Sequence, residues 1–242
     1  MKIRNCIAFT AAAAFASIAS AGPSITVKYL GKGAGQDVNI TFNGNSTNVF
    51  AGQLNHQLSN AGGGYGWLNG NHLTYCTDLF QSFRWNAAMT DYSLVANGSV
   101  NGFTARQADL LGKLYTKAGA VQTKDESVAF QLAVWEIVDE TASTLGVGSG
   151  TFTIDAGASA TQINLANAWL SAISDPAAAK AWTAERLYSP TTQDFVIFSA
   201  YQLRLGTLQA AAAVPEPTSL ALVGLALGGL AWQRRGRSRE GA

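Results

Sequence analysis

Cysteine and histidine are scarce in this chain, and their scarcity excludes several kinds of site. The 242 residues contain two cysteines, Cys6 and Cys76, and two histidines. A zinc site needs three or four ligands at suitable spacing, and a disulfide framework needs paired cysteines. The glycine run at residues 31–35 lacks the spacing of a phosphate or dinucleotide loop. We therefore expect no metal site and no cofactor.

Charged residues are also few, at 13% of the chain. Residues 22–213 carry ten Lys and Arg against thirteen Asp and Glu, a net charge of −3. Proteins that bind nucleic acid need a basic surface to neutralise phosphates. This composition therefore argues against a nucleic-acid partner.

Long apolar runs occur only near the two ends of the chain. Residues 1–21 have the three parts of a secretory signal peptide: basic Lys2 and Arg4, an apolar run over 7–18, and the small residues A-S-A at 19–21. We expect cleavage after residue 21. The cut would remove Cys6 and leave a single cysteine in the exported protein.

The C-terminal end has its own three-part order. A linker over 210–217 contains Pro215, Glu216 and Pro217, an apolar run covers 218–232, and a basic tail over 233–242 carries Arg234, Arg235, Arg237 and Arg239. Basic residues beside an apolar helix stay on the cytoplasmic side and stop transfer. A helix of this length covers about 22 Å of a hydrocarbon core near 30 Å. So short a transmembrane helix suits a transient sorting role.

This order resembles the PEP-CTERM sorting signal of Gram-negative bacteria. In that family an exosortase-type membrane protease recognises the Pro-Glu-Pro region and processes the tail. The resemblance implies Pro215, Glu216 and Pro217 as the sorting residues and an exosortase as a partner. It also implies a location at the cell surface or in the extracellular matrix, after transient anchoring in the inner membrane.

Residues 22–209 remain as one exported domain, and their pattern predicts strands. Residues 24–30 and 37–42 are rich in β-branched side chains, and the glycines of 31–35 between them predict a hairpin or two neighbouring strands. Residues 73–80 and 194–205 predict two further strands, the first of which carries Cys76.

Helices are predicted between these strands. Thr104 and Gln107, and likewise Thr123 and Glu126, form capping boxes that open helices ending at Gly119 and at residue 140. Residues 161–173 predict a third helix, and Asp175-Pro176 predicts the start of a fourth. The fold class is therefore α+β, a sheet or sandwich-like portion with an inserted helical portion.

Two residues of this domain call for a chemical explanation. An unpaired cysteine in an exported protein indicates an intermolecular disulfide, a reactive thiol or an inert buried side chain. Gln131 lies in a helix that is apolar on most sides, and burying its amide costs about 1–3 kcal/mol unless its polar atoms are paired. Attack of the Cys76 sulfur on the Gln131 amide would expel ammonia and form an internal thioester.

The motifs around these residues resemble the thioester domains of bacterial surface adhesins. Tyr75-Cys76-Thr77-Asp78 is similar to the strand motif of that family, and the helix segment F-Q-L-A-V-W-E-I at 130–137 is similar to its helix motif. The resemblance implies a Cys76–Gln131 cross-link, with Tyr75, Asp78 and Trp135 around it. It implies a partner that carries amines, either a protein or a polysaccharide.

The function expected from these features is covalent attachment in adhesion or in matrix cross-linking. Each molecule would react once, so we do not expect an enzyme with turnover and assign no catalytic residue. Two alternatives remain open. One is a structural biofilm or exopolysaccharide-associated protein in which Cys76 stays a free buried thiol. The other is a carbohydrate-binding module that uses Tyr65, Trp67 and Trp85 as stacking surfaces.

Overall fold

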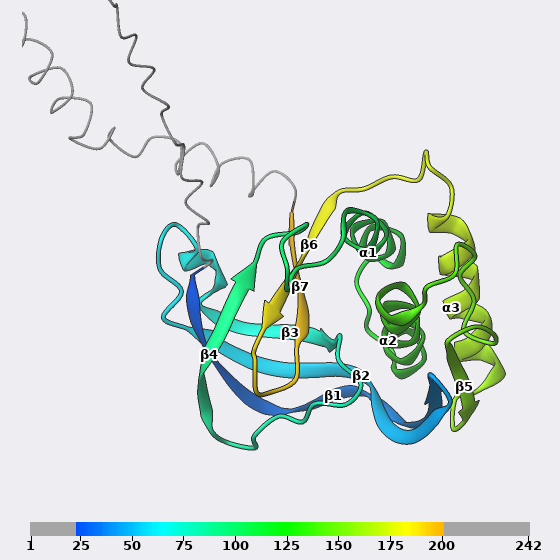
Figure 1. The fold of residues 1–242 in the computed structure, drawn as a ribbon, viewed down its shortest axis with the longest axis horizontal. Coiled ribbons are helices and arrows are strands. Elements are labelled where there is room, and N and C mark those ends of the chain that lie inside the picture. Colours follow the sequence, from blue (N-terminus) through cyan, green and yellow to red (C-terminus); the bar gives the residue numbers. More distant parts are fainter. Residues whose placement is uncertain (1–22, 201–242) are drawn as a thin grey trace, which may run out of the picture.

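The computed structural model describes residues 23–200, and these form an α+β fold in which antiparallel strands lie beside a group of helices (Figure 1). The elements follow one another as β1 (Ser24–Phe42), β2 (Asn45–Ser59), the 3-10 turn η1 (Gly66–Leu68), β3 (Gly70–Cys76), β4 (Ala88–Val95), α1 (Ala105–Ala118), α2 (Lys124–Asp139), β5 (Phe152–Ala156), α3 (Ala160–Ile173), β6 (Trp182–Tyr188) and β7 (Phe195–Ala200). The predicted fold class is confirmed at this level.

The strands form one sheet that closes on itself, so it is not a two-layer sandwich. Its order is β2-β3-β7-β6-β4-β1-β5, and β1 and β2 also pair with each other. The six strands other than β5 therefore form a ring, and β5 pairs with the far half of β1. All these pairings between the named strands are antiparallel.

The predicted hairpin over 24–42 is wrong, because these residues form the single long strand β1. Its hairpin partner is β2, joined through a turn at Asn43 and Gly44, which both have positive φ. The glycine run continues the strand through two register shifts. Gly35 lies opposite Gly52, and a Cβ on either would collide with the backbone of the other strand. Glycine is required there because the two backbones approach so closely.

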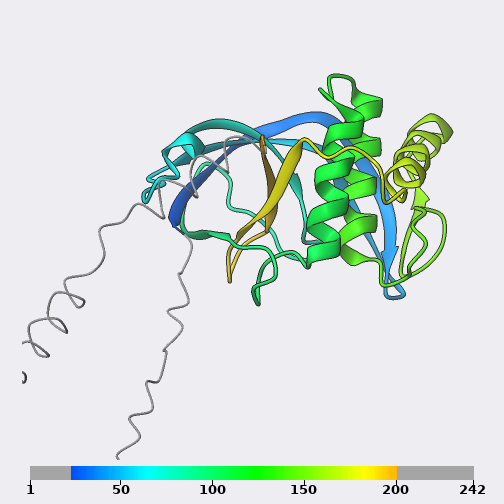
Figure 2. The same ribbon diagram turned by 90° about the horizontal axis from the view of Figure 1, so that it is seen from above.

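Three helices occur in residues 23–200, and the predictions for them are confirmed. Each begins with a capping box. A Thr or Ser side chain accepts from the N–H of the third helical residue, and the side chain of that residue accepts from the backbone N–H of the Thr or Ser. The three helices pack against one another to one side of the strands, and α2 contacts β1, β2 and β3 as well (Figures 1 and 2). Its residues from Ser127 to Ile137 are all buried. An all-round apolar helix is stable here because it is covered on every side.

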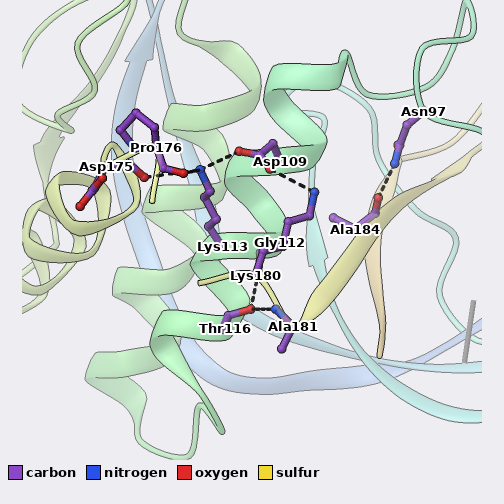
Figure 3. Close-up of polar contacts among 10 residues, drawn as sticks. All are labelled: Asn97, Asp109, Gly112, Lys113, Thr116, Asp175, Pro176, Lys180, Ala181 and Ala184. Atoms are coloured by element: carbon purple, nitrogen blue, oxygen red, sulfur yellow. Dashed lines mark hydrogen bonds and ion pairs between the residues drawn. The ribbon is translucent and has the colours of Figure 1, made fainter. Parts of the chain in front are cut away.

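The predicted fourth helix at Asp175 does not form. The chain makes a single turn there, with the Asp175 carbonyl accepting from Ala178, and then runs toward β6. Lys113 of α1 donates to the carbonyls of Asp175 and Pro176, which holds the turn against the helix (Figure 3). These contacts fix the turn against α1, and residues 178–181 have no regular structure before β6 begins at Trp182.

Further contacts in the same region fix α1 beside β6. Lys113 and Lys180 both pair with Asp109, and Thr116 accepts from the Ala181 N–H at 2.9 Å (Figure 3). A Cβ at Gly112 would collide with the Trp182 carbonyl, so the helix and the incoming strand are in close contact. The helical portion is thereby tied to the sheet at β6, in addition to the packing of α2.

Strand predictions were less accurate than helix predictions. The strand over 73–80 is β3, which starts at Gly70 and ends at Cys76, and the strand over 194–205 is β7 for its described part. Strands β2, β4, β5 and β6 were not predicted. The signal peptide, the linker with its Pro-Glu-Pro motif, the apolar run and the basic tail lie outside residues 23–200. Within residues 23–200, no helix has the length and hydropathy needed to cross a membrane.

Candidate functional site

Cys76 is the last residue of β3, a strand that packs against α2. It pairs with Phe195 of β7, and the next residue, Thr77, donates to the Asp194 carbonyl at 3.0 Å. Only 3% of Cys76 is exposed. Within residues 23–200 it is the one cysteine, and it is free of any disulfide. The sulfur is therefore held in the interior at the junction of strand and helix.

Gln131 of α2 is hydrogen-bonded to the backbone of Cys76 on both sides of its amide. The Cys76 N–H donates to Gln131 Oε1 at 3.0 Å, and Gln131 Nε2 donates to the Cys76 carbonyl at 2.8 Å. Gln131 is fully buried. The fold thus brings together the two residues that the sequence motifs single out, although they are 55 positions apart.

The Cys76 sulfur has its own polar partners. Its thiol donates to the Asp78 carbonyl at 2.8 Å, and the side-chain amide of Gln193 donates to the sulfur and, at 3.0 Å, to the same carbonyl. Gln193 stands just before β7 and was not predicted as part of the site. No local pattern identifies it, because only the pairing of β3 with β7 brings it to Cys76.

Trp135 stands one turn after Gln131 on α2 and lines the same cavity as Cys76. It is 1% exposed, and its indole N–H has no hydrogen-bond partner among residues 23–200. Burial raises the pKa of the Cys76 thiol to about 12, while the Asp78 backbone and the Trp135 indole act in the opposite direction. The indole N–H is therefore an unpaired donor close to the sulfur.

Tyr75 and Asp78 support the site in different ways. The Tyr75 ring packs on Phe130 with centroids 4.4 Å apart, and its hydroxyl accepts from Gln53 at 3.2 Å. The Asp78 carboxylate accepts from the N–H groups of Phe80 and Gln81 and so shapes the turn after β3. Its backbone carbonyl, and not its carboxylate, contacts the sulfur.

A cavity of about 200 Å³ leads to Cys76. Most of its lining is apolar, and a few polar side chains contribute to it. The lining residues are Val49, Phe50, Leu54, Cys76, Asp78, Leu79, Gln81, Ser82, Phe83, Trp135 and Gln193. Several of these residues belong to the segment after β3, which therefore forms much of the wall. The cavity gives a small molecule or an extended side chain access to a buried sulfur.

Acidic groups lie near this cavity. Burial and the neighbouring Asp78 raise the pKa of the Asp139 carboxyl to about 7, and burial raises that of Asp194 to about 6. Arg186 partly offsets both shifts. One oxygen of Asp139 has no hydrogen-bond partner in the described part of the chain. These carboxyls can exchange protons near neutral pH.

Neither histidine lines the cavity at Cys76. His56 Nδ1 is 2.8 Å from the Thr74 hydroxyl, and burial lowers the pKa of His56 to about 3. His72 Nε2 is 2.8 Å from the Leu68 carbonyl. Both line a separate cavity of about 310 Å³. Neither imidazole is therefore placed to exchange a proton with the Cys76 thiol.

Two other expectations concern metal ions and sugar-stacking aromatics. In the described residues, no group of three or more His, Cys, Asp or Glu side chains is arranged to hold a metal ion. Tyr65 and Trp67 pack partly against the core, whereas Trp85 is 63% exposed and lies edge-on to Tyr29. Within residues 23–200 the three aromatics make no ring contact with one another, and the carbohydrate-binding alternative stays a prediction.

Comparison with known proteins gives one match. Residues 213–235 match the PEP-CTERM protein-sorting motif. The chain is therefore an exported protein that carries an exosortase sorting signal, and the matched range includes Pro215, Glu216 and Pro217. No curated protein and no solved structure matches the chain.

Proposed function

We propose that this exported protein forms an internal thioester between Cys76 and Gln131 and attaches covalently to an amine- or hydroxyl-bearing partner at the cell surface or in the matrix. The observation that carries the proposal is the pair of hydrogen bonds between the Gln131 amide and the Cys76 backbone. The Cys76 N–H that donates to Gln131 Oε1 polarises the carbonyl, which favours nucleophilic attack on its carbon.

The bond-forming step needs no outside reagent. The Cys76 sulfur attacks the amide carbon of Gln131, the carbon–nitrogen bond breaks, and the nitrogen leaves as ammonia with the proton of the thiol. The resulting acyl group stays at Gln131, which is fully buried, beside a sulfur that is 3% exposed, so contact with water is limited and hydrolysis is slow. An acyl group stored in this way is available to a nucleophile that fits the cavity.

Amines suit the surroundings of the cavity. A lysine side chain is mostly protonated at neutral pH, with a pKa near 10.4 in water, so it must lose a proton before it attacks. Asp78 lines the cavity, and Asp139 has a pKa of about 7. Negative charge attracts an ammonium group, and a carboxylate of this pKa can accept its proton.

Capture of a small amine tests the proposal. The full chain is expressed in a Gram-negative host, purified, and incubated with methylamine at neutral pH. We expect one methylamine per molecule, bound to Gln131 by peptide mapping. Cys76→Ala and the isosteric Gln131→Glu should take up none. Gln57→Ala should behave as wild type, because Gln57 is exposed on β2 and lies outside this cavity. Uptake that survives Cys76→Ala would contradict the proposal.

A second candidate is a structural surface protein with a permanently free thiol. It is favoured by the same two hydrogen bonds, because they satisfy the buried amide without any covalent bond. Burial also holds the thiol pKa at about 12, so an unreacted Cys76 would be inert at neutral pH. The absence of methylamine uptake by wild type, with a full-mass protein, would favour this function.

A further inference from the structure

Opening a buried thioester requires that the protein stabilise the sulfur as it leaves. When a nucleophile attacks, the sulfur leaves with the electron pair of the broken bond, and negative charge develops on it. Cys76 is 3% exposed, so little water reaches that sulfur. A developing charge in such a place is costly unless fixed hydrogen-bond donors face it. The sulfur therefore needs donors supplied by the protein.

Two side chains offer such donors. The Gln193 amide donates to the Cys76 sulfur, and it also lines the cavity. The Trp135 indole N–H is buried close to the sulfur and has no partner among the described residues. Gln193 belongs to the segment just before β7 and Trp135 belongs to α2, so the two donors come from different elements. This arrangement resembles an oxyanion hole that is built around sulfur.

The Gln193 donor is held in place from several directions. Its other contact is the Asp78 carbonyl at 3.0 Å, its backbone N–H donates to Ser82 at 3.3 Å, and its carbonyl accepts from the Tyr92 hydroxyl at 2.6 Å. A donor that is already fixed needs no reorganisation when charge appears. Gln193 is thus preorganised for the sulfur as a leaving group.

We propose that Gln193, assisted by Trp135, is a catalytic residue that stabilises the Cys76 thiolate as the thioester opens. The inference rests on the proposed function. In the step concerned, an amine nitrogen bonds to the acyl carbon of Gln131, and the carbon–sulfur bond breaks with its electrons on Cys76. The proton that the nitrogen loses ends on the sulfur, which gives an amide and a thiol. The Gln193 donor lowers the barrier to carbon–sulfur cleavage.

The test compares Gln193→Ala and the isosteric Gln193→Glu with Gln57→Ala as control, because Gln57 is exposed on β2 and lies outside the cavity at Cys76. In the full-chain protein, the rate of methylamine incorporation should fall about tenfold for Gln193→Ala and further for Gln193→Glu, whose carboxylate repels the thiolate. Gln57→Ala should keep the wild-type rate. Rates for the Gln193 variants within twofold of wild type would overturn the inference.

A second readout separates this inference from the thioester itself. Alkylation of the free Cys76 thiol by iodoacetamide depends on its thiolate fraction. At fixed pH, Gln193→Glu should slow alkylation about tenfold, the size of one pKa unit, with Gln57→Ala unchanged. The measurement works on methylamine-opened protein and equally on protein that never formed a thioester. A full-mass wild type would refute the proposed function alone, and equal alkylation rates would overturn the role of Gln193.

Discussion

Gln131 has a structural role that is separate from the chemical role proposed for it. The sequence indicates that its amide requires partners, and the Cys76 backbone supplies them on both sides. Those hydrogen bonds fasten α2 to the end of β3. They would stabilise the fold even if no thioester formed, so the two roles can be measured separately.

The structural role is tested in a protein that cannot form the cross-link. In a Cys76→Ala background, Gln131→Ala should lower the free energy of unfolding by about 2–4 kcal/mol, because it leaves a cavity and two unpaired backbone groups. Urea denaturation measures the change. Gln57→Ala at an exposed position of β2 should change it little. Equal stabilities for both variants would show that the Gln131 contacts contribute nothing.

The sequence predicted some site residues and not others, for identifiable reasons. Cys76, Gln131 and Trp135 belong to two local motifs, so their pairing could be proposed from the sequence. Gln193 is 117 positions from Cys76 and has no motif of its own. The role of the Asp78 carbonyl also depends on the turn after β3. Contacts of this kind follow from tertiary structure alone.

At the scale of elements, helix α2 was predicted well because its signals are local. The capping box at Thr123 fixes its start, and its apolar composition indicates burial on all sides. Strands β4 and β5 pair with segments far away in the chain, whereas β6 forms a hairpin with β7 and pairs with β4 on its other side. Strand signals of this kind depend on the tertiary context. Strand β2 could have been found, because Asn43-Gly44 is a strong hairpin signal between two extended segments.

The stability of the protein depends on pH through Glu136, near the C-terminal end of α2. Glu136 is fully buried, accepts from the Gly146 N–H through one oxygen, and has no hydrogen bond to the other among residues 23–200. Burial and the neighbouring Glu140 raise the pKa of Glu136 from 4.5 to about 7. The folded protein therefore holds this proton more tightly than the unfolded chain.

The sign of the effect follows from that difference. The contribution of Glu136 to stability is complete below pH 4.5 and is lost as pH rises through about 7. Glu136→Gln should remove this loss and raise the free energy of unfolding at pH 8 by about 1–2 kcal/mol relative to wild type. Urea denaturation from acid to neutral pH measures it. Exposed Asp37→Asn serves as control, and parallel pH profiles for wild type and Glu136→Gln would contradict the account.

At the scale of the whole molecule, the closed sheet and the helical group meet at Cys76. Strand β3 brings the cysteine, α2 brings the glutamine and the tryptophan, and the start of β7 brings Gln193. The sorting motif at 213–235 follows this domain in the chain. A domain that stores an acyl group and is exported to the surface would meet its partner only after leaving the cytoplasm.

The central claim is tested most directly by the intact mass of the whole protein, purified without added amines. A Cys76–Gln131 thioester lowers the mass by one ammonia relative to the sequence of the processed chain, and denatured wild type shows no alkylatable thiol until the bond is opened. Cys76→Ala and Gln131→Glu should each show the full mass of their sequences. A wild-type protein of full mass, with one thiol that alkylates as soon as the chain is unfolded, would contradict the account.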